Sequence, residues 1–184
     1  MNYGIKAIVF DLGNVLVDFD YSIAAKRMAH FSGIDFKNIP RILLSSDITG
    51  LFEEGKILPE DFFLKIKDML NLNISYERFI SIWNEVFFLS AKNRSVYSLA
   101  NGLRKNYRIA MLSNINILHY EYLRKRFPVF NIFDEVFISC KMGMIKPDPK
   151  IYIKVLLTYV KVIENILPPL PWQFRSSDAR PKES

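Results

Sequence analysis

The sequence has a single cysteine, only two histidines and no uninterrupted apolar run of eighteen residues. One cysteine excludes a disulfide within the chain and is typical of a reducing compartment, so we expect a cytoplasmic protein. A membrane-spanning helix needs a longer apolar run than any present here, so no membrane association is expected. The first residues contain no small-residue cleavage site, so we do not expect a secretory signal.

The charged residues are equally uninformative about a macromolecular partner. The net charge of +6 comes from lysines and arginines that are scattered along the 184 residues, so we do not expect nucleic-acid binding. The positive excess instead favours phosphorylated metabolites as ligands. His30 and His119 lack metal-ligand spacing, and we expect surface or packing roles for both.

The most informative segment lies at the start of the chain. Residues 7–10, Ala-Ile-Val-Phe, form a short apolar run that ends on the carboxylate of Asp11, and Gly13 follows two residues later. Such a run predicts a strand buried on both faces of a parallel sheet, whose carboxyl end is where α/β proteins bind ligands. A glycine there lets the backbone turn sharply and approach a ligand closely. This combination favours chemistry on a phosphate.

Residues from about 21 to 90 are predicted to form successive helices with no strand among them. Ser75 is expected to cap one helix and Pro59 to open the helix before it. Apolar side chains recur at helical spacing in both and are expected to form a core: Phe62, Phe63, Ile66, Met69, Leu70, Phe79, Ile82, Trp83, Val86 and Phe87.

From residue 92 onward, the pattern changes to alternating helices and strands. We expect helices over residues 96–103, 117–126 and 150–164 and strands over residues 108–112 and 135–138. This alternation predicts right-handed βαβ units and a parallel sheet. The predicted fold is α/β, a Rossmann-like core of residues 1–17 and 91–165, with residues 18–90 inserted as a helical cap and residues 166–184 as an atypical tail.

Polar residues follow the predicted strands, and the carboxyl ends of parallel strands meet at one edge of a sheet. Residues 11–15, Asp-Leu-Gly-Asn-Val, resemble the first motif of the haloacid dehalogenase-like hydrolase superfamily. Ser113 resembles the hydroxyl of its second motif, and Lys146, in the segment KPDPKIY, resembles the lysine of its third. The helical insertion between the first two motifs is similar to the small helical cap of that family.

The resemblance implies a role for each matching residue. Asp11 stands at the position of the nucleophile that forms an aspartyl-phosphate, which divides one difficult step into two easier ones. Mg²⁺ is the implied cofactor, with Asp11 and the carbonyl of Gly13 as ligands. Lys146 is implied to hold the nucleophile and the phosphoryl group as a point charge. The implied phosphate-binding residues are Leu12, Gly13, Ser113, Asn114 and Lys146.

The first departure from the family pattern is Gly13 itself. Most phosphatases of this family carry a second aspartate there, as general acid and base for the leaving group. A subset that resembles this chain has the same Asp-x-Gly-Asn-Val arrangement and includes sugar-phosphate phosphatases. Protonation of the leaving group then needs water, the substrate or another residue. Because general acid catalysis contributes roughly 10²–10⁴-fold, we expect a slow enzyme.

The second departure lies at the C-terminus. After the helix near Asn165, the family pattern continues with a strand that finishes in an acidic pair. Residues 167–171 instead contain three prolines, which an internal strand does not tolerate. We therefore expect the C-terminal part of the family fold to be missing or altered and β-strand edges to be left open. Asp178 is the one carboxylate that remains as a candidate metal ligand there, the alternative being an ordinary tail residue.

Other residues near the predicted site have two interpretations. Asp18 and Asp20 are either solvated loop acids or contacts to a substrate, and Tyr21 and Phe52 face either the pocket or the cap core. Cys140 lacks a partner histidine and is a poor candidate for a nucleophile.

The predicted function is a Mg²⁺-dependent phosphohydrolase that acts on a small phosphorylated metabolite. The alternative is a catalytically impaired relative that binds a phosphate ligand or a protein partner, because of Gly13 and the altered tail. Metal-independent dehalogenation is a weaker third option, since Gly13-Asn14 does not match the Tyr-Gly pair expected there.

Overall fold

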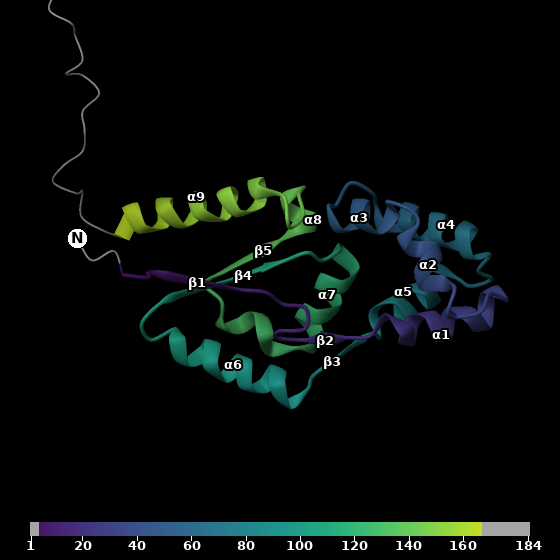
Figure 1. Cartoon of the computed structure of the whole chain (residues 1–184), viewed down its shortest axis with the longest axis horizontal. Helices are drawn as coiled ribbons and strands as arrows, with labels where there is room; N and C mark the ends of the chain where they lie inside the picture. The colour runs from purple at the N-terminus through teal and green to yellow at the C-terminus, as the bar shows by residue number, and fades with distance from the viewer. Residues whose placement is uncertain (1–3, 167–184) are drawn as a thin grey trace, which may run out of the picture.

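A three-stranded parallel sheet forms the centre of the molecule (Figure 1). The computed structural model describes residues 4–166, with side chains through residue 159. The strands are β1 (Ala7–Phe10), β4 (Arg108–Ser113) and β5 (Glu135–Ile138), in the order β1-β4-β5. This confirms the predicted parallel sheet. Within the described residues, β1 is an edge strand of this sheet, because it pairs with β4 on one side and with no strand on the other.

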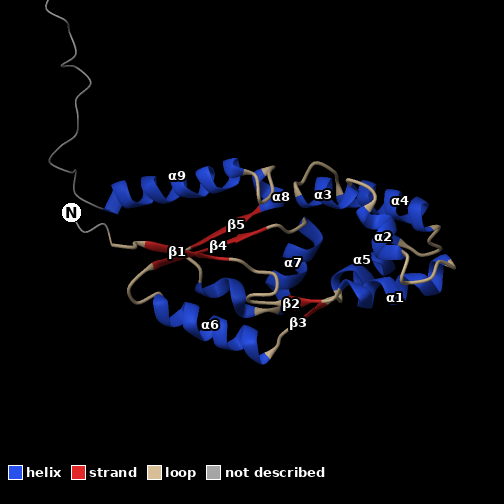
Figure 2. Ribbon diagram, viewed as in Figure 1, coloured by secondary structure: helices blue, strands red, loops and turns tan. Residues whose placement is uncertain are grey.

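Helices cover both faces of the sheet (Figure 2). On one face lie α6 (Ala91–Leu103) and α7 (Ile117–Arg126), and on the other lies α9 (Pro149–Ile166). The side chains of β4 alternate accordingly, since Ala110 and Leu112 pack with α9 while Ile109 packs with α6. Burial on both faces explains the almost continuous apolar sequence of β4. The prediction that residues 7–10 are buried on both faces was wrong, because β1 lies at an edge of the described sheet and Val9 is 45% exposed.

A helical insertion extends beyond the carboxyl ends of the strands, on the right in Figure 1. Its five helices are α1 (Tyr21–Ser32), α2 (Ile39–Leu44), α3 (Ile48–Glu53), α4 (Pro59–Leu70) and α5 (Tyr76–Asn84). Pro59 opens α4, and the Ser75 side chain accepts the N–H of Arg78 at the start of α5, as expected. None of the helices within residues 4–166 has the length and apolarity needed to cross a membrane.

The insertion has a core of its own, built largely from aromatic rings. Phe52 and Phe62 stack with ring centroids 4.1 Å apart, and Trp83 contacts the edge of Phe62 at 5.0 Å. Offset and edge-on contacts of this kind add about 0.5–1.5 kcal/mol each to the apolar burial. Phe52 therefore packs in the core of the insertion, and it is not among the residues that line the cavity beside Asp11.

Two short strands join the insertion to the sheet domain. β2 (Asp18–Phe19) and β3 (Phe87–Phe88) pair antiparallel where the chain enters and leaves the insertion. The prediction of helices alone over residues 21–90 was wrong here. The α5 helix ends at Asn84, and Phe87 lies in β3 although its spacing continued the helical stripe. A short apolar run fits either structure, and the pairing with β2 decides between them.

Two further elements were not expected from the sequence. A 3₁₀ helix, η1 (Pro128–Ile132), follows α7, and a single turn, α8 (Ser139–Met142), follows β5. The α8 turn lies against α3 and forms part of the junction between the helical insertion and the sheet domain.

His119 lies at this junction and is fully buried among aromatic rings. Its ring stacks on Trp83 at 5.2 Å and meets Phe87 edge-on at 4.9 Å. Nε2 donates to the carbonyl oxygen of Trp83 at 3.0 Å, and Nδ1 accepts from the side-chain amide of Asn116 at 3.0 Å. This neutral tautomer leaves no acceptor for a second ring proton, and burial lowers the pKa of His119 to about 4.

This burial predicts a stability that depends on pH. The unfolded chain takes up the His119 proton near pH 6.5 and the folded chain only near pH 4, so stability is lost as the pH falls between these values. We expect the free energy of unfolding to fall by about 2 kcal/mol from this residue between pH 7.5 and pH 5. The His119→Gln variant retains a hydrogen-bond donor for the carbonyl of Trp83. In urea unfolding, its free energy of unfolding should fall by about 2 kcal/mol less than that of the wild type between pH 7.5 and pH 5. The exposed His30→Gln variant is the control, and an equal loss in all three proteins would contradict the assignment.

Candidate active site

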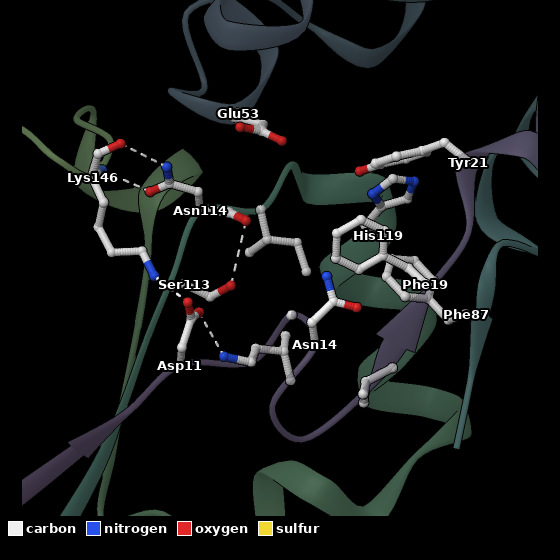
Figure 3. A pocket seen from close by; sticks show the side chains of 14 residues that line it. Asp11, Asn14, Phe19, Tyr21, Glu53, Phe87, Ser113, Asn114, His119 and Lys146 are labelled. Carbon is white, nitrogen blue, oxygen red and sulfur yellow. Dashed lines mark hydrogen bonds and ion pairs between the residues drawn. The ribbon is translucent and has the colours of Figure 1, made fainter. Parts of the chain in front are cut away.

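A cavity of about 330 Å³ lies between the carboxyl edge of the sheet and the helical insertion (Figure 3). Its walls come from the segment after β1, the end of β4, the loop before α9 and the insertion. The lining residues are Asp11, Leu12, Gly13, Asn14, Val17, Phe19, Tyr21, Glu53, Phe87, Ser113, Asn114, Ile115, His119 and Lys146. All the sequence-predicted site residues within the described part of the chain are among them.

An ion pair joins the first and third motifs on the floor of this cavity. Lys146 Nζ lies 2.8 Å from Asp11 Oδ2 and donates to the carbonyl oxygen of Leu112 at 3.1 Å. The other carboxylate oxygen of Asp11 accepts the backbone N–H of Leu12 at 2.7 Å. These contacts fix the orientation of the carboxylate, while 46% of the Asp11 side chain remains exposed to solvent.

Asn114 fixes the backbone of Lys146 by two hydrogen bonds. Its amide nitrogen donates to the carbonyl oxygen of Lys146 at 2.9 Å, and its Oδ1 accepts the N–H of Lys146 at 2.7 Å. This reciprocal pair joins the loop after β4 to the loop before α9. The side-chain amide of Asn114 therefore positions Lys146, a contact that the sequence did not indicate.

Ser113 ends β4 beside Asp11, with only 3% of its surface exposed. Its hydroxyl makes one long contact, 3.4 Å to the carbonyl oxygen of Asn114. A hydroxyl held this weakly is free to donate to an anion in the cavity. The parallel register, with Phe10 opposite Met111, brings Asp11 and Ser113 to the same edge.

The chain turns tightly after Asp11. The carbonyl oxygen of Leu12 accepts the N–H groups of Leu16 and Val17, at 2.8 and 3.1 Å, and Asn14 adopts a left-handed conformation with φ of 57°. A Cβ at Gly13 would lie 2.9 Å from Cε1 of Phe19. The ring of Phe19 therefore occupies the space that the side chain of a second aspartate would need.

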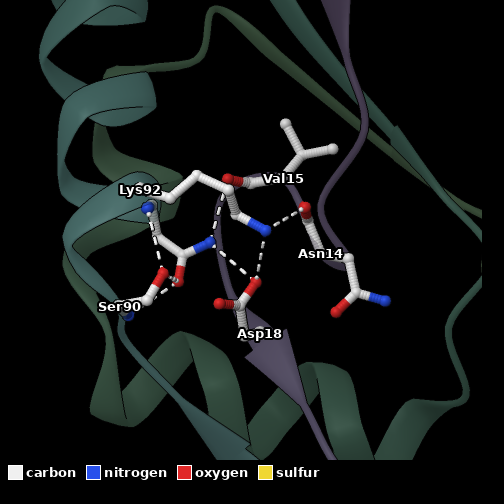
Figure 4. A network of polar contacts seen from close by, with 6 residues as sticks. Asn14, Val15, Asp18, Ser90 and Lys92 are labelled. Carbon is white, nitrogen blue, oxygen red and sulfur yellow. Dashed lines mark hydrogen bonds and ion pairs between the residues drawn. The ribbon is translucent and has the colours of Figure 1, made fainter.

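Asp18 and Asp20 have structural partners and do not line the cavity. Asp18 accepts from the buried amide of Asn93 at 3.0 Å and lies 3.1 Å from Lys92 Nζ (Figure 4). The hydrogen bonds from Asn93 and Ser90 lower the pKa of Asp18. Asp20 caps α1 by accepting the N–H of Ser22 at 2.8 Å.

The same network ties the start of α6 to the turn after β1. Asn93 also donates to the carbonyl oxygen of Val15 at 3.0 Å, and Lys92 donates to that of Asn14 at 3.0 Å (Figure 4). The network therefore fixes both connections of the insertion, the one through β2 and the one through β3.

The insertion contributes an aromatic wall and one acid that the sequence analysis missed. Tyr21 lines the cavity, and its ring centroid lies 5.1 Å from that of Phe19. Of its two interpretations, the one in which Tyr21 faces the pocket is therefore correct. Glu53, at the end of α3, points into the cavity opposite Asp11 (Figure 3). Burial raises the pKa of the Glu53 carboxyl. No sequence motif marks Glu53, because only the docking of the insertion brings it to the site.

The oxygen donors near Asp11 are of the kind that Mg²⁺ prefers. This ion is commonly bound by one or two carboxylates together with waters and substrate phosphates, so the Asp11 carboxylate and the Gly13 carbonyl form a suitable set. Within the part of the chain that the structure describes, no three His, Cys, Asp or Glu side chains gather as a metal site. Asp178, the third predicted ligand, lies outside the described residues.

The fold and this arrangement agree with comparisons to known proteins. Residues 5–164 match the family model for haloacid dehalogenase-like hydrolases, so the chain belongs to that family. D-ribitol-5-phosphate phosphatase of Bacteroides thetaiotaomicron is 29% identical over 157 residues, which cover 80% of this chain and 74% of the relative. Sesquiterpene phosphatase astK of Aspergillus oryzae is 26% identical over 152 residues, covering 82% and 72%. The prediction of a haloacid dehalogenase-like hydrolase of the phosphatase type is confirmed.

The same family appears among solved structures. A haloacid dehalogenase family enzyme of Bacteroides thetaiotaomicron, in complex with magnesium and inorganic phosphate, is 28% identical with a TM-score of 0.73. The match covers 85% of this chain and 80% of that enzyme. A predicted hydrolase of the family from Porphyromonas gingivalis has the same fold at 24% identity, with a TM-score of 0.67 and coverage of 84% and 76%.

The contact between Gly13 and Phe19 predicts that the missing aspartate cannot simply be restored. We expect Gly13→Asp to lower the free energy of unfolding by about 1–3 kcal/mol, because the new side chain overlaps the Phe19 ring. Chemical unfolding of the single variants and of Gly13→Asp with Phe19→Leu measures the coupling. In the Phe19→Leu background, Gly13→Asp should lower the free energy of unfolding by no more than half as much as it does in the wild type. A Gly13→Asp protein as stable as the wild type would contradict this interpretation.

Proposed function

We propose that the protein is a Mg²⁺-dependent phosphohydrolase that cleaves a small phosphorylated metabolite through an aspartyl-phosphate intermediate. The observation that carries the proposal is the exposed Asp11 carboxylate held against Lys146 at the floor of the cavity. The phosphatase relatives support the reaction, and the magnesium and phosphate bound in a similar structure support the cofactor. The predicted cytoplasmic location remains a prediction.

The chemistry follows from the positions of the charged and polar groups. Asp11 attacks the phosphorus atom, and the bond from phosphorus to the leaving oxygen breaks. Lys146 stabilises the charge that spreads over the phosphoryl oxygens, and its contact with the Leu112 carbonyl keeps the ammonium group in place. The Ser113 hydroxyl and the N–H groups of Gly13 and Asn114 bind the phosphoryl oxygens. The N–H of Leu12, which was predicted to join them, instead donates to the carboxylate of Asp11. Water then releases phosphate from Asp11.

The metal ion would be held by the carboxylate of Asp11 and the carbonyl oxygen of Gly13, with Asp178 as a third proposed ligand. When bound, it shields the negative charges that otherwise repel an attacking carboxylate. Asp11 is therefore proposed both as nucleophile and as metal ligand, one oxygen for each role.

We further propose that residues 18–90 act as the cap domain, over a core formed by residues 1–17 and 91–165, with residues 166–184 as a separate tail. The β2–β3 ribbon and the Asn93 network lie where such a cap would hinge. The cavity is of a size for a small ligand and has polar groups only on part of its wall. A small phosphorylated metabolite fits these dimensions.

A second candidate is a relative that binds a phosphate ligand or a protein partner with little turnover. Its basis is Gly13, which provides no acid for the leaving group where most of the family carries one. The two candidates differ in metal-dependent turnover, which a single assay measures.

The assay is phosphate release from sugar, sugar-alcohol and isoprenoid monophosphates and from p-nitrophenyl phosphate, with Mg²⁺ or with EDTA. We expect release that requires the metal, and a loss of at least about 10³-fold in Asp11→Asn, because an amide cannot form the intermediate. Asp148→Asn is the matched control and should retain activity, because Asp148 is a half-buried acid outside the cavity wall whose carboxylate accepts the N–H of Lys150.

Release that is unaffected by Asp11→Asn would exclude this nucleophile. A folded wild-type protein that binds phosphate without releasing it from any substrate would favour the second candidate.

A further inference from the structure

The reaction proposed above has no residue that protonates the leaving oxygen. Glu53 lies on the side of the cavity where such a residue would be needed. The segment that carries it is the end of α3, where the insertion approaches the core. Figure 3 shows its carboxylate directed into the cavity, across from Asp11 and Lys146. In-line attack by Asp11 on a phosphate ester in this cavity would therefore place the leaving oxygen on the side of Glu53.

The core holds this segment by its backbone. The buried hydroxyl of Ser139 accepts the N–H of Ile115 at 2.9 Å and donates to the carbonyl oxygen of Glu53 at 2.6 Å. Gly55 makes a second contact, because its backbone lies so close to the carbonyl oxygen of Cys140 that any Cβ would overlap this oxygen. Gly55 also has a positive φ of 72°, which favours glycine. Two close contacts thus fix Glu53 against the same core that carries the phosphate-binding groups.

Glu53 also lies where two cavities meet. A second cavity, of about 330 Å³, opens inside the insertion and shares Tyr21 and Glu53 with the first. Its walls are mostly apolar and include Ala24, Ala25, Met28, Ile39, Leu43 and Phe52. The first cavity has the groups that suit a phosphate, and the second has room for the organic part of a substrate. The bond that is cleaved would then lie between them, beside Glu53.

We propose that Glu53 is the general acid and base of this enzyme, in the role that Gly13 cannot fill. The inference rests on the proposed phosphohydrolase function and assigns its proton transfers. In the first step, Asp11 bonds to phosphorus as the ester bond breaks, and the proton of Glu53 passes to the leaving oxygen. In the second step, a water attacks phosphorus, its proton returns to Glu53, and the bond to Asp11 breaks to give phosphate.

The surroundings suit a carboxyl group that exchanges a proton. Tyr21 lines both cavities beside Glu53, and the other titratable groups around the first cavity are His119, Asp11 and Lys146. His119 is held neutral and Lys146 is paired with Asp11, so neither places a free positive charge next to Glu53. The raised pKa caused by burial makes the protonated form of Glu53 available closer to neutral pH.

The test compares two leaving groups in Glu53→Gln. Protonation matters for an alkoxide, a strong base, and hardly at all for p-nitrophenolate, a weak one. We expect kcat/KM to fall by about 10²-fold or more for the alkyl monophosphate that the wild type cleaves fastest. For p-nitrophenyl phosphate, kcat/KM should change by less than about threefold. The wild-type kcat/KM for the alkyl substrate should also fall as the pH rises through the pKa of Glu53, and this decline should be absent from Glu53→Gln.

Glu54→Gln is the matched control, because Glu54 follows Glu53 directly at the end of α3 but pairs with Lys56 at 2.5 Å and does not line the cavity. It should behave as the wild type with both substrates. A second variant, Glu53→Ala, should regain part of its alkyl phosphatase rate in a formic acid–formate buffer, in which formic acid replaces the missing carboxyl group as proton donor.

Each contrary result is specific. Equal losses with both leaving groups, or a change in KM alone, would show that Glu53 binds or positions substrate and would overturn its role as an acid. Alkyl turnover that needs Asp11 but survives in Glu53→Gln would overturn this inference and leave the proposed function intact. A folded wild type without any turnover would overturn both.

Discussion

The parallel pairing of β1 with β4 is the constraint on which the site depends. It places the carboxyl ends of both strands at one edge, so that Asp11 and Ser113 lie side by side although about a hundred residues separate them. The packing of β4 holds this strand in place, because Ala110 and Leu112 fit against α9 while Ile109 fits against α6. Lys146 then has two fixed acceptors, the carboxylate of Asp11 and the carbonyl of Leu112, and its position follows from the strands.

The helical insertion is more than a cover over this edge. It shares a buried aromatic junction with the core around His119. Its backbone also contacts the core, where the carbonyl oxygen of Glu53 accepts the Ser139 hydroxyl and Gly55 lies against the carbonyl of Cys140. The crowding of Gly13 by Phe19 belongs to the same junction, since Phe19 lies in the strand that leads into the insertion. In the reaction that we propose, the nucleophile comes from the core and the proton from the insertion, so catalysis requires the two layers to be docked.

Most of the fold was predictable because its elements have strong local signals. The apolar strands, the Ser75 cap and the proline that opens α4 all lie where the sequence placed them. The errors fall at Phe87 and at α8, where the local pattern is short and a tertiary contact determines the structure. A two-residue strand has no periodicity of its own and is defined only by its partner.

The sequence by itself determined the family, the sheet and the residues of its three motifs, because a buried strand that ends in a polar group has a distinctive pattern. It also showed that Gly13 leaves the leaving group without the usual acid. Only the tertiary structure decided what surrounds these residues: that Phe19 fills the space beside Gly13, that Asn114 holds Lys146, and that Glu53 faces Asp11. These contacts join segments far apart in the chain, and they depend on how the insertion docks on the core, which no local pattern encodes.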